Sequence, residues 1–414
     1  MTLALRALSL LAALAAAAFA AKDSCVECHS ALPDNLQAPV TAMQTDVHRR
    51  SGFSCAACHG GNPAADDQQA AMDRSRGFVG RFPRTEVPRL CARCHSDAGL
   101  MHKYAPQQRV DQYAQYQTSV HGKRIASGDS AAAVCTDCHG AHGVLTVKDG
   151  RSPVHPLRLP ATCARCHADP QHMAKYKIPT DQFAQYQESV HWEAVEKRGD
   201  LSAPTCASCH GNHGATPPGV RSVSAVCGTC HVLMEDLYNK SPHQPVFASM
   251  GVAGCTACHG SHAVLKTSVK MLVGPDAVCS GCHDADSKGG AAAARMSDSI
   301  LRLATALERS EAILSKAVRS GMEVSEAILR ENDARESLVK ARVAVHAFDP
   351  AAVEKPVAEG LKIASETYLA GEQAMQERQR RRLGLGISLI TIAVTVAGLW
   401  FAIKRLEAPA RQKV

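Results

Sequence analysis

The sequence is poor in aromatic side chains. Phe, Tyr and Trp together make up 4% of its 414 residues, and only two residues are tryptophan. This scarcity excludes a core built on aromatic packing, because these side chains usually supply the large flat apolar surfaces of a core. The sequence also lacks a persistent strand pattern, a Walker loop and a cluster of metal-binding carboxylates. Its chemistry must therefore come from other residues.

No cysteine lies outside one short motif, C-x-x-C-H, which occurs nine times and uses all 18 cysteines. None is left for a structural disulfide or a zinc knuckle, and zinc sites need paired ligand sets rather than a histidine after every C-x-x-C. C-x-x-C-H is the attachment signature of c-type haem. The motifs therefore predict nine covalently attached haem c groups, bound through Cys25, Cys28, Cys55, Cys58, Cys91, Cys94, Cys135, Cys138, Cys163, Cys166, Cys206, Cys209, Cys227, Cys230, Cys255, Cys258, Cys279 and Cys282.

The spacing suits this chemistry, since residues i and i+3 lie on one face of a helical turn and both cysteines can meet one macrocycle. The next residue then supplies the proximal iron ligand. Each haem has roughly 29 residues between Cys25 and His283, whereas a domain uses on the order of 100 residues for its core. We therefore expect the haems to form the core, with proximal ligands His29, His59, His95, His139, His167, His210, His231, His259 and His283.

A second histidine follows several motifs, as in "CTDCHGAHG", where His142 comes three residues after His139. Three residues span at most about 10 Å, too little to reach round a macrocycle to the other side of the same iron. We therefore expect His142 to bind a neighbouring haem and to link one haem to the next.

The chain repeats with a period of 72 residues, from Cys91 to Cys163, and each copy holds two motifs with a histidine in the linker between them. A compressed copy begins at Cys227 and a degenerate copy opens the chain, with Asn62 where the extra histidine would stand. The repeat predicts seven distal iron ligands, namely His48, His121, His191 and His243 from linkers and His142, His213 and His262 after motifs.

Four histidines remain, namely His102, His155, His172 and His346. His346 ends a predicted helix that could fold back onto the last haems, and we expect it to be a ligand, although a helix-end histidine is also favoured by the helix dipole alone. The other three are either ligands or surface histidines. Met101 and Met173 align across the repeat, and each is either an axial ligand or a filler beside a porphyrin.

Both ends of the chain carry apolar segments. Residues 1–20 end in Ala18-Phe19-Ala20 and predict a cleaved signal peptide, with an uncleaved anchor as the alternative. Residues 383–403 are uncharged and long enough to cross a bilayer, with a buried core helix as the alternative. Haem attachment after export would place residues 21–288 outside the inner (plasma) membrane and the tail, residues 404–414, in the cytoplasm.

Between the haem region and this span, apolar residues recur at helical spacing from Ala291, and no proline lies between Pro275 and Pro350. This pattern predicts one long helix, broken at "HAFDP", and a second helix that runs into the membrane. The expected fold is therefore mostly α with extensive loops: a nonahaem domain (21–288), a helical hairpin stalk (289–382) and one transmembrane helix (383–403).

The motifs "QYQTSVHG" and "CTDCHGAHG" resemble the class III multihaem cytochromes c over Cys25 to His283. This resemblance implies low-potential electron carriage between quinol-oxidising membrane partners and periplasmic or outer-membrane acceptors. The segment "ARVAVHAFDP" is similar to the helical end of pentahaem nitrite reductases and octahaem hydroxylamine oxidoreductases, where a histidine in such a segment binds a haem. The chain departs from those enzymes because it has no C-x-x-C-K motif.

We therefore expect a membrane-anchored periplasmic electron-transfer protein of anaerobic respiration rather than an enzyme. Its expected partners are a quinol-oxidising complex or b-type cytochrome on one side and periplasmic cytochromes or reductases on the other. The net charge of +7 does not argue for nucleic acid, because it omits the haem propionates. The alternative is an oxidoreductase with one five-coordinate haem that reduces a nitrogen or sulfur oxyanion. The sequence does not predict the oligomeric state.

Overall fold

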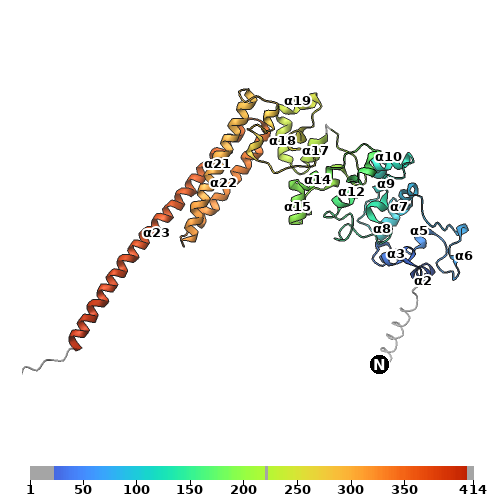
Figure 1. The fold of residues 1–414 in the computed structure, drawn as a ribbon, viewed down its shortest axis with the longest axis horizontal. Helices are drawn as coiled ribbons and strands as arrows, with labels where there is room; N and C mark the ends of the chain where they lie inside the picture. The colour runs from blue at the N-terminus through green and yellow to red at the C-terminus, as the bar shows by residue number, and fades with distance from the viewer. Residues whose placement is uncertain (1–22, 220–221, 408–414) are drawn as a thin grey trace, which may run out of the picture. The chain divides into compact units, whose positions relative to one another are not determined.

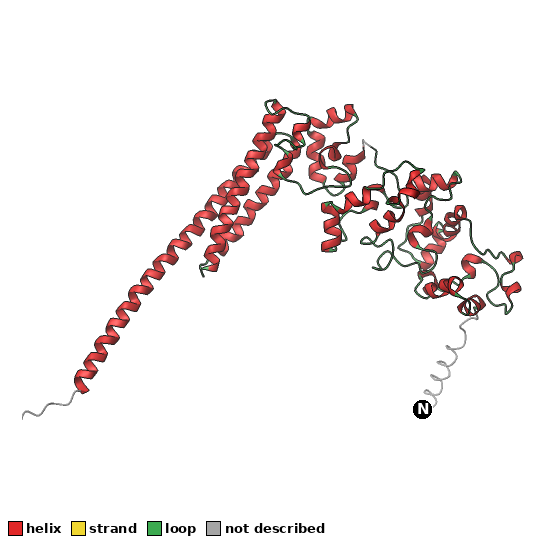
Figure 2. Cartoon of the chain, viewed as in Figure 1, coloured by secondary structure: helices red, strands yellow, loops and turns green. Residues whose placement is uncertain are grey.

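The computed structural model describes residues 23–219 and 222–407, which form helices and loops without a strand (Figures 1 and 2). The mostly helical fold class predicted from the sequence is confirmed. The predicted signal peptide, residues 1–20, lies outside the described residues. The chain divides into two compact units, one made of residues 1–219 and 259–266 and the other of residues 220–258 and 267–414.

The first unit consists of short helices joined by loops. Polar caps limit these helices: the Asp97 carboxylate, for example, accepts a hydrogen bond of 2.9 Å from the backbone N–H of Leu100. The α-helices are α2 (Ser24–Ser30), α3 (Asp34–Met43), α4 (Val47–Arg50), α5 (Ala56–His59), α6 (Gln68–Ala71), α7 (Val87–His95), α8 (Ala98–Tyr104), α9 (Gln112–Thr118), α10 (Val120–Ala126), α11 (Cys135–His139), α12 (Leu159–His167), α13 (Pro170–Ala174), α14 (Gln182–Gln187), α15 (Val190–Arg198) and α16 (Cys206–His210). The 3-10 helices η1 (Arg74–Arg76) and η2 (Arg84–Glu86) complete the set.

The two full copies of the repeat fold alike. In one copy the hydroxyl of Tyr116 donates a 2.8 Å hydrogen bond to the carbonyl of Ala133, and in the other Tyr186 donates an equal bond to Pro204. The apolar core of the first copy is small and consists of Val87, Ile125, Ala132 and Val134. So small a core agrees with the expectation that bound macrocycles supply most of the buried apolar surface.

The second unit combines short helices with a long helical stalk. Its short elements are α17 (Val223–Gly228), α18 (Val232–Lys240), α19 (His243–Met250), η4 (Val269–Met271) and η5 (Cys279–Gly281), while α20 (Gly254–His259) lies where the chain passes between the units. The stalk consists of α21 (Lys288–Arg319), α22 (Ser325–Ala344), η6 (Val345–Ala347) and α23 (Pro350–Glu407).

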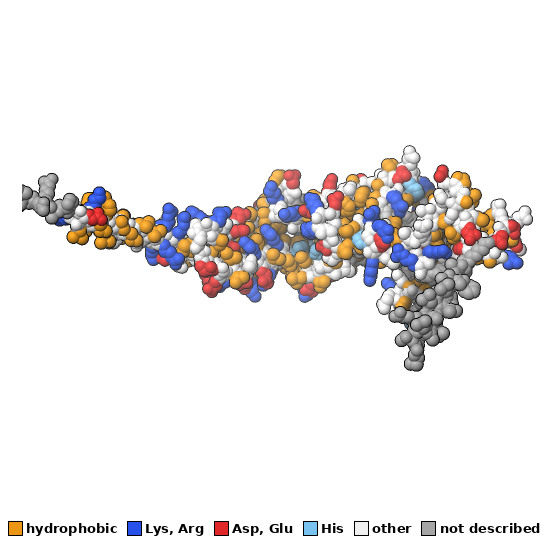
Figure 3. All heavy atoms as spheres, turned by 90° about the horizontal axis from the view of Figure 1, so that it is seen from below, with side chains coloured by type: hydrophobic (Ala, Val, Ile, Leu, Met, Phe, Trp, Pro, Cys, Tyr) orange, Lys and Arg blue, Asp and Glu red, His pale blue; other side chains and the backbone are white. Residues whose placement is uncertain are grey.

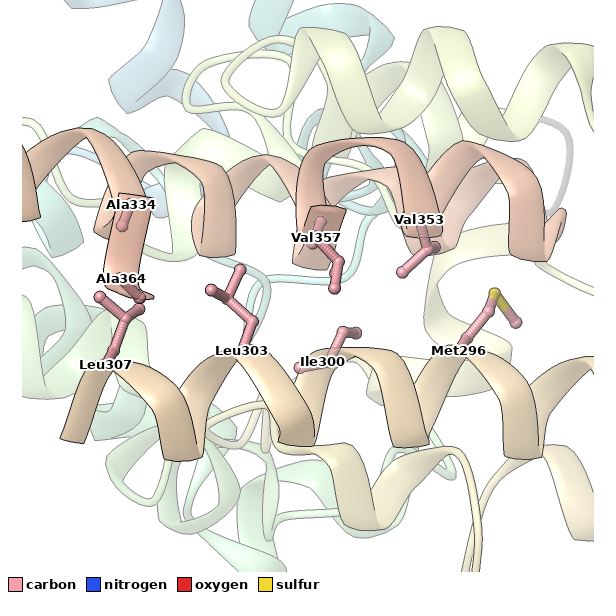
Figure 4. Close-up of a cluster of buried hydrophobic side chains, with 9 residues drawn as sticks. Met296, Ile300, Leu303, Leu307, Ala334, Val353, Val357 and Ala364 are labelled. Atoms are coloured by element: carbon pink, nitrogen blue, oxygen red, sulfur yellow. The ribbon is translucent and has the colours of Figure 1, made fainter. Parts of the chain in front are cut away.

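The stalk is a three-helix bundle in which α22 runs antiparallel to α21 and α23. Its core lies between apolar side chains of α21 and small or β-branched residues of the other two helices (Figure 4). Leu303 is fully buried at its centre. The core residues are Met296, Ile300, Leu303, Leu307, Ala334, Ala341, Val353, Val357 and Ala364.

The first stalk helix is shorter than the sequence predicts. We expected one helix from Ala291 to "HAFDP", but α21 ends at Arg319 and the chain turns back into α22. Gly321 adopts φ +75°, a conformation that favours glycine. The N–H groups of Gly321 and Met322 close the helix on the carbonyls of Val318 and Ala317, a Schellman motif. The expected two-helix hairpin is therefore a bundle of three helices.

The last helix, α23, is long and apolar enough to cross a membrane. Its most apolar stretch of 18 residues is fully exposed in the described structure. On the face drawn in Figure 3, the outer part of α23 shows hydrophobic side chains between groups of Lys and Arg. This helix contains the predicted span, residues 383–403. Of the predicted tail, residues 408–414 lie outside the described part of the chain.

Candidate functional site

Short helical turns carry the C-x-x-C-H motifs, as the chemistry of attachment requires. In most motifs the histidine is at or near the last residue of the helix, as at His95 in α7 and His167 in α12. The described cysteines form no disulfide. Both cysteines of each motif are therefore available for thioether bonds.

Six predicted distal histidines face six proximal histidines across a constant gap. The ring centroids are 6.0 Å apart in the pairs His48–His95, His210–His262 and His243–His283, and 6.1 Å apart in the pairs His59–His142, His121–His167 and His139–His213.

This gap fits one metal ion between two imidazoles. A bond from an imidazole nitrogen to a metal is about 2 Å long, so two such bonds in line place the ring centroids about 6 Å apart. Burial lowers the pKa of His95, His121, His139 and His167 below the ordinary value. The imidazoles therefore stay neutral near pH 7, and the neutral form is the one that binds iron.

The pairs follow a fixed rule along the chain. Each of the linker histidines His48, His121 and His243 faces the second motif after it in the sequence. His121, for example, faces His167, beyond the motif of Cys135. A histidine that follows a motif faces a motif earlier in the sequence, two places before the one that it follows. His142, for example, follows the motif of Cys135 and faces His59, in the motif of Cys55. His142 therefore faces a histidine beyond the adjacent motif of Cys91, and the segments of the chain interlock.

A backbone hydrogen bond joins the two kinds of ligand segment. The donor is the backbone N–H of the residue just before a linker histidine. The acceptor is the backbone carbonyl two residues after a histidine that follows a motif. The bonds run from Val47 to Val144 (2.9 Å), from Val120 to Ala215 (3.1 Å) and from Val190 to Val264 (2.9 Å). This bond holds the ligand segments of two successive motifs together. In the fourth copy Pro242 has no N–H to donate.

Successive motifs are neighbours within each unit. Cys91 lies beside Cys135, Cys163 beside Cys206 and Cys227 beside Cys255, close enough for the two thiols of each pair to shift each other's pKa. Burial is the main cause that raises the pKa of the Cys58 and Cys258 thiols. The thiols of the next motif, Cys91 beside Cys58 and Cys279 beside Cys258, raise it further. Within each unit these attachment sites therefore lie beside their neighbours in the sequence.

Asp46 is a functional candidate that the sequence analysis missed. Its carboxylate accepts a 2.9 Å hydrogen bond from Nδ1 of His48 and a 2.8 Å bond from the His48 backbone N–H. Such a bond fixes the tautomer and orientation of a metal-binding imidazole. The signal was in the repeat, because "DVH" at Asp46 aligns with "SVH" at Ser119 and Ser189.

The stalk contributes Phe348 beside a predicted ligand, a second candidate that the sequence analysis missed. The ring of Phe348 lies 3.9 Å from that of His243 between centroids, and Phe348 adopts φ +54°, which is uncommon outside glycine. His346, two residues earlier, directs Nδ1 to the carbonyl of Val343 at 2.9 Å.

Some predicted residues are not brought into these six pairs. Among the described residues no histidine ring contacts that of His29, whose Nδ1 lies 3.3 Å from the carbonyl of Leu36. His155 accepts a hydrogen bond from the N–H of Leu157, and His172 lies beside Tyr176. Met101 and Met173 are buried. The ligand roles of all the predicted histidines, including His191, His231, His259 and His346, stay predictions.

Comparison with known proteins supports a haem-binding chain. The sequence profile of cytochrome c3 matches residues 47–168 and 200–284, which make up half of the chain. The chain is also similar to the multiheme cytochrome MtrA of Shewanella baltica (strain OS185), with 26% identity over 183 residues, 41% of this chain and 48% of that protein. The chain thus matches about half the length of that relative. No solved structure matches.

Proposed function

The chain belongs to the cytochrome c3 family, and from this membership we propose that it is a membrane-anchored periplasmic cytochrome that carries electrons through nine haem c groups. The family implies covalently bound haem c and electron transfer. The number of haems, the location and the role in respiration are our proposal.

The histidine pairs carry this proposal. Six proximal histidines each face a second imidazole at 6.0–6.1 Å, so both axial positions of the iron would be filled at these sites. A filled coordination shell leaves no position for a substrate, while the haem supplies one-electron exchange between Fe(III) and Fe(II) when it is bound. Within each unit the chain's own residues hold successive sites side by side, which suits transfer from one site to the next.

We further propose that a membrane quinol-oxidising complex or b-type cytochrome donates electrons, and that periplasmic cytochromes or reductases accept them. The C-terminal helix would anchor the chain in the inner membrane with the haem region in the periplasm. This orientation follows from haem attachment after export, and the apolar helix Pro350–Glu407 supports an anchor. Anaerobic respiration is the setting that the resemblance to class III cytochromes implies.

One observation favours a second candidate function. His29 faces no other histidine ring among the described residues, although most described motif histidines do. An iron held by His29 with an open sixth position would bind small molecules. The chain would then be an oxidoreductase with a five-coordinate haem that reduces a nitrogen or sulfur oxyanion.

Electron paramagnetic resonance of the oxidised full-length protein in detergent separates the two functions. The carrier function predicts nine haems per chain by haem quantification, all low-spin and unchanged by cyanide. One high-spin haem that binds cyanide would favour the oxidoreductase. Its loss in a C25A/C28A variant, but not in a C279A/C282A variant, would assign it to His29. A count well below nine would contradict the proposal itself.

A further inference from the structure

The residue two positions before each linker histidine is buried. Asp46 is 1% exposed, Ser119 0%, Ser189 2% and Ser241 5%. Each caps the start of the segment that carries the histidine. The side chains of Ser119 and Ser189, for example, accept hydrogen bonds of 2.9 and 3.0 Å from backbone N–H groups three residues on.

Asp46 alone among these four residues can carry a negative charge. Besides the two bonds from His48, its carboxylate accepts a 2.7 Å bond from the backbone N–H of Val144. In residues 23–219 and 222–407, no Lys or Arg side chain forms an ion pair with it. Three N–H groups therefore donate to this carboxylate, and no described Lys or Arg side chain pairs with it.

The charge acts on the imidazole that faces His95. When Nδ1–H of His48 donates to Asp46, Nε2 is left to bind the iron, and the carboxylate makes the imidazole a stronger electron donor. An electron-rich ligand and a buried negative charge both favour Fe(III), which carries one more positive charge than Fe(II). The linker histidine of the next copy, His121, follows Ser119 and lacks this charge.

We propose that Asp46 is a positioning residue that lowers the reduction potential of the haem attached at Cys91 and Cys94 relative to the haem attached at Cys163 and Cys166. This inference rests on the proposed function, because it requires both haems to be bound. Two sites that the repeat makes otherwise alike then differ in energy. The reduction potential therefore differs between these two haems, and the haem at Cys91 holds an electron less strongly than the haem at Cys163.

The test is a potentiometric titration of the full-length protein in detergent, followed by visible absorbance and electron paramagnetic resonance, with haem content measured for each variant. Asp46→Asn removes the charge and keeps the shape, and Asp46→Ser installs the residue of the other copies. Ser119→Asp is the reciprocal change. Asp97→Asn is the matched control, since Asp97 caps α8 through Leu100 without contacting an imidazole.

We expect one haem to titrate at a more positive potential in both Asp46 variants, one haem at a more negative potential in Ser119→Asp, and no change in Asp97→Asn. The inference would be overturned if the Asp46 variants, with full haem content, had the same reduction potentials as the wild type. A shift of equal size in Asp97→Asn would also overturn it. If the Asp46 variants lose haem, Ser119→Asp decides, because it leaves Asp46 in place. Full haem content with unshifted potentials refutes only this inference, whereas low haem content in the wild type refutes the proposed function.

Discussion

The side chain of His142 connects two distant parts of the chain, because its ring lies 6.1 Å from that of His59. Replacing His142 with alanine removes the second imidazole from one site and leaves both cysteines of every motif. We predict that haem content stays at the wild-type value, while one haem of the set changes from low-spin to high-spin and binds cyanide. Electron paramagnetic resonance before and after addition of cyanide measures both changes.

His102 provides the control for this variant. It lies on α8 and is exposed, so His102→Ala should leave every haem low-spin. A low-spin spectrum from His142→Ala with full haem content would show that His142 is not an iron ligand.

At this scale the sequence predicted the residues but not their partners. The motifs predicted the proximal histidines, and the repeat predicted seven distal candidates, since both depend on local spacing. Which motif His142 faces depends on how segments about 80 residues apart pack, and no local pattern records that. Asp46 was missed for a related reason: its importance comes from a hydrogen bond to Nδ1 of His48, not from its residue type.

Among the secondary-structure elements, α23 depends on a close approach to α21 and α22 at Gly360. A Cβ atom added there would lie 2.8 Å from Cδ2 of Leu303 and 2.9 Å from Cβ of Ser337, both in the packed bundle. We predict that Gly360→Ala lowers the free energy of unfolding by about 1–3 kcal/mol, although alanine favours helix formation. The midpoint of thermal unfolding, followed by circular dichroism, measures this change.

Gly384, on the same helix, offers the comparison, because a Cβ added there meets no atom within 4 Å. Gly384→Ala should leave the midpoint unchanged or raise it. Equal midpoints for the two variants would mean that the stalk repacks around the added methyl group without cost.

The stalk also shows what periodicity can and cannot predict. Regular apolar spacing and the lack of proline correctly indicated long helices after Ala291. The same spacing continues on both sides of Gly321, so the pattern gave no sign of the turn between α21 and α22. Glycine inside a helix only weakens it, and the Schellman hydrogen bonds that end α21 depend on the bundle packing that follows.

For the whole molecule, we expect the last part of α23 to determine where the protein resides. Ending the chain after Arg382 removes the apolar residues 383–403 and leaves every C-x-x-C-H motif and the stalk core. We predict that this truncated protein keeps the wild-type haem content and appears in the soluble periplasmic fraction instead of the membrane fraction. Cell fractionation with haem staining measures the distribution.

Membrane association that survives this truncation would contradict a C-terminal anchor and would direct attention to the first 20 residues. The candidate span was predictable because a helix that crosses a bilayer needs a long uncharged run, and such a run is visible in a single sequence. Which attachment sites are neighbours within a unit was not predictable, because this depends on contacts such as that between Cys91 and Cys135.

The interlocking of ligand segments also constrains how such a molecule can change in length. Removing residues 91–162, one full repeat with two motifs, would bring His48 into register with His167 and His213 into register with His59. Removing a single motif would instead place one distal histidine opposite the proximal histidine of a different motif. Another distal histidine would then have no proximal histidine opposite it. A deletion that keeps every remaining histidine opposite a motif therefore has to remove two motifs together.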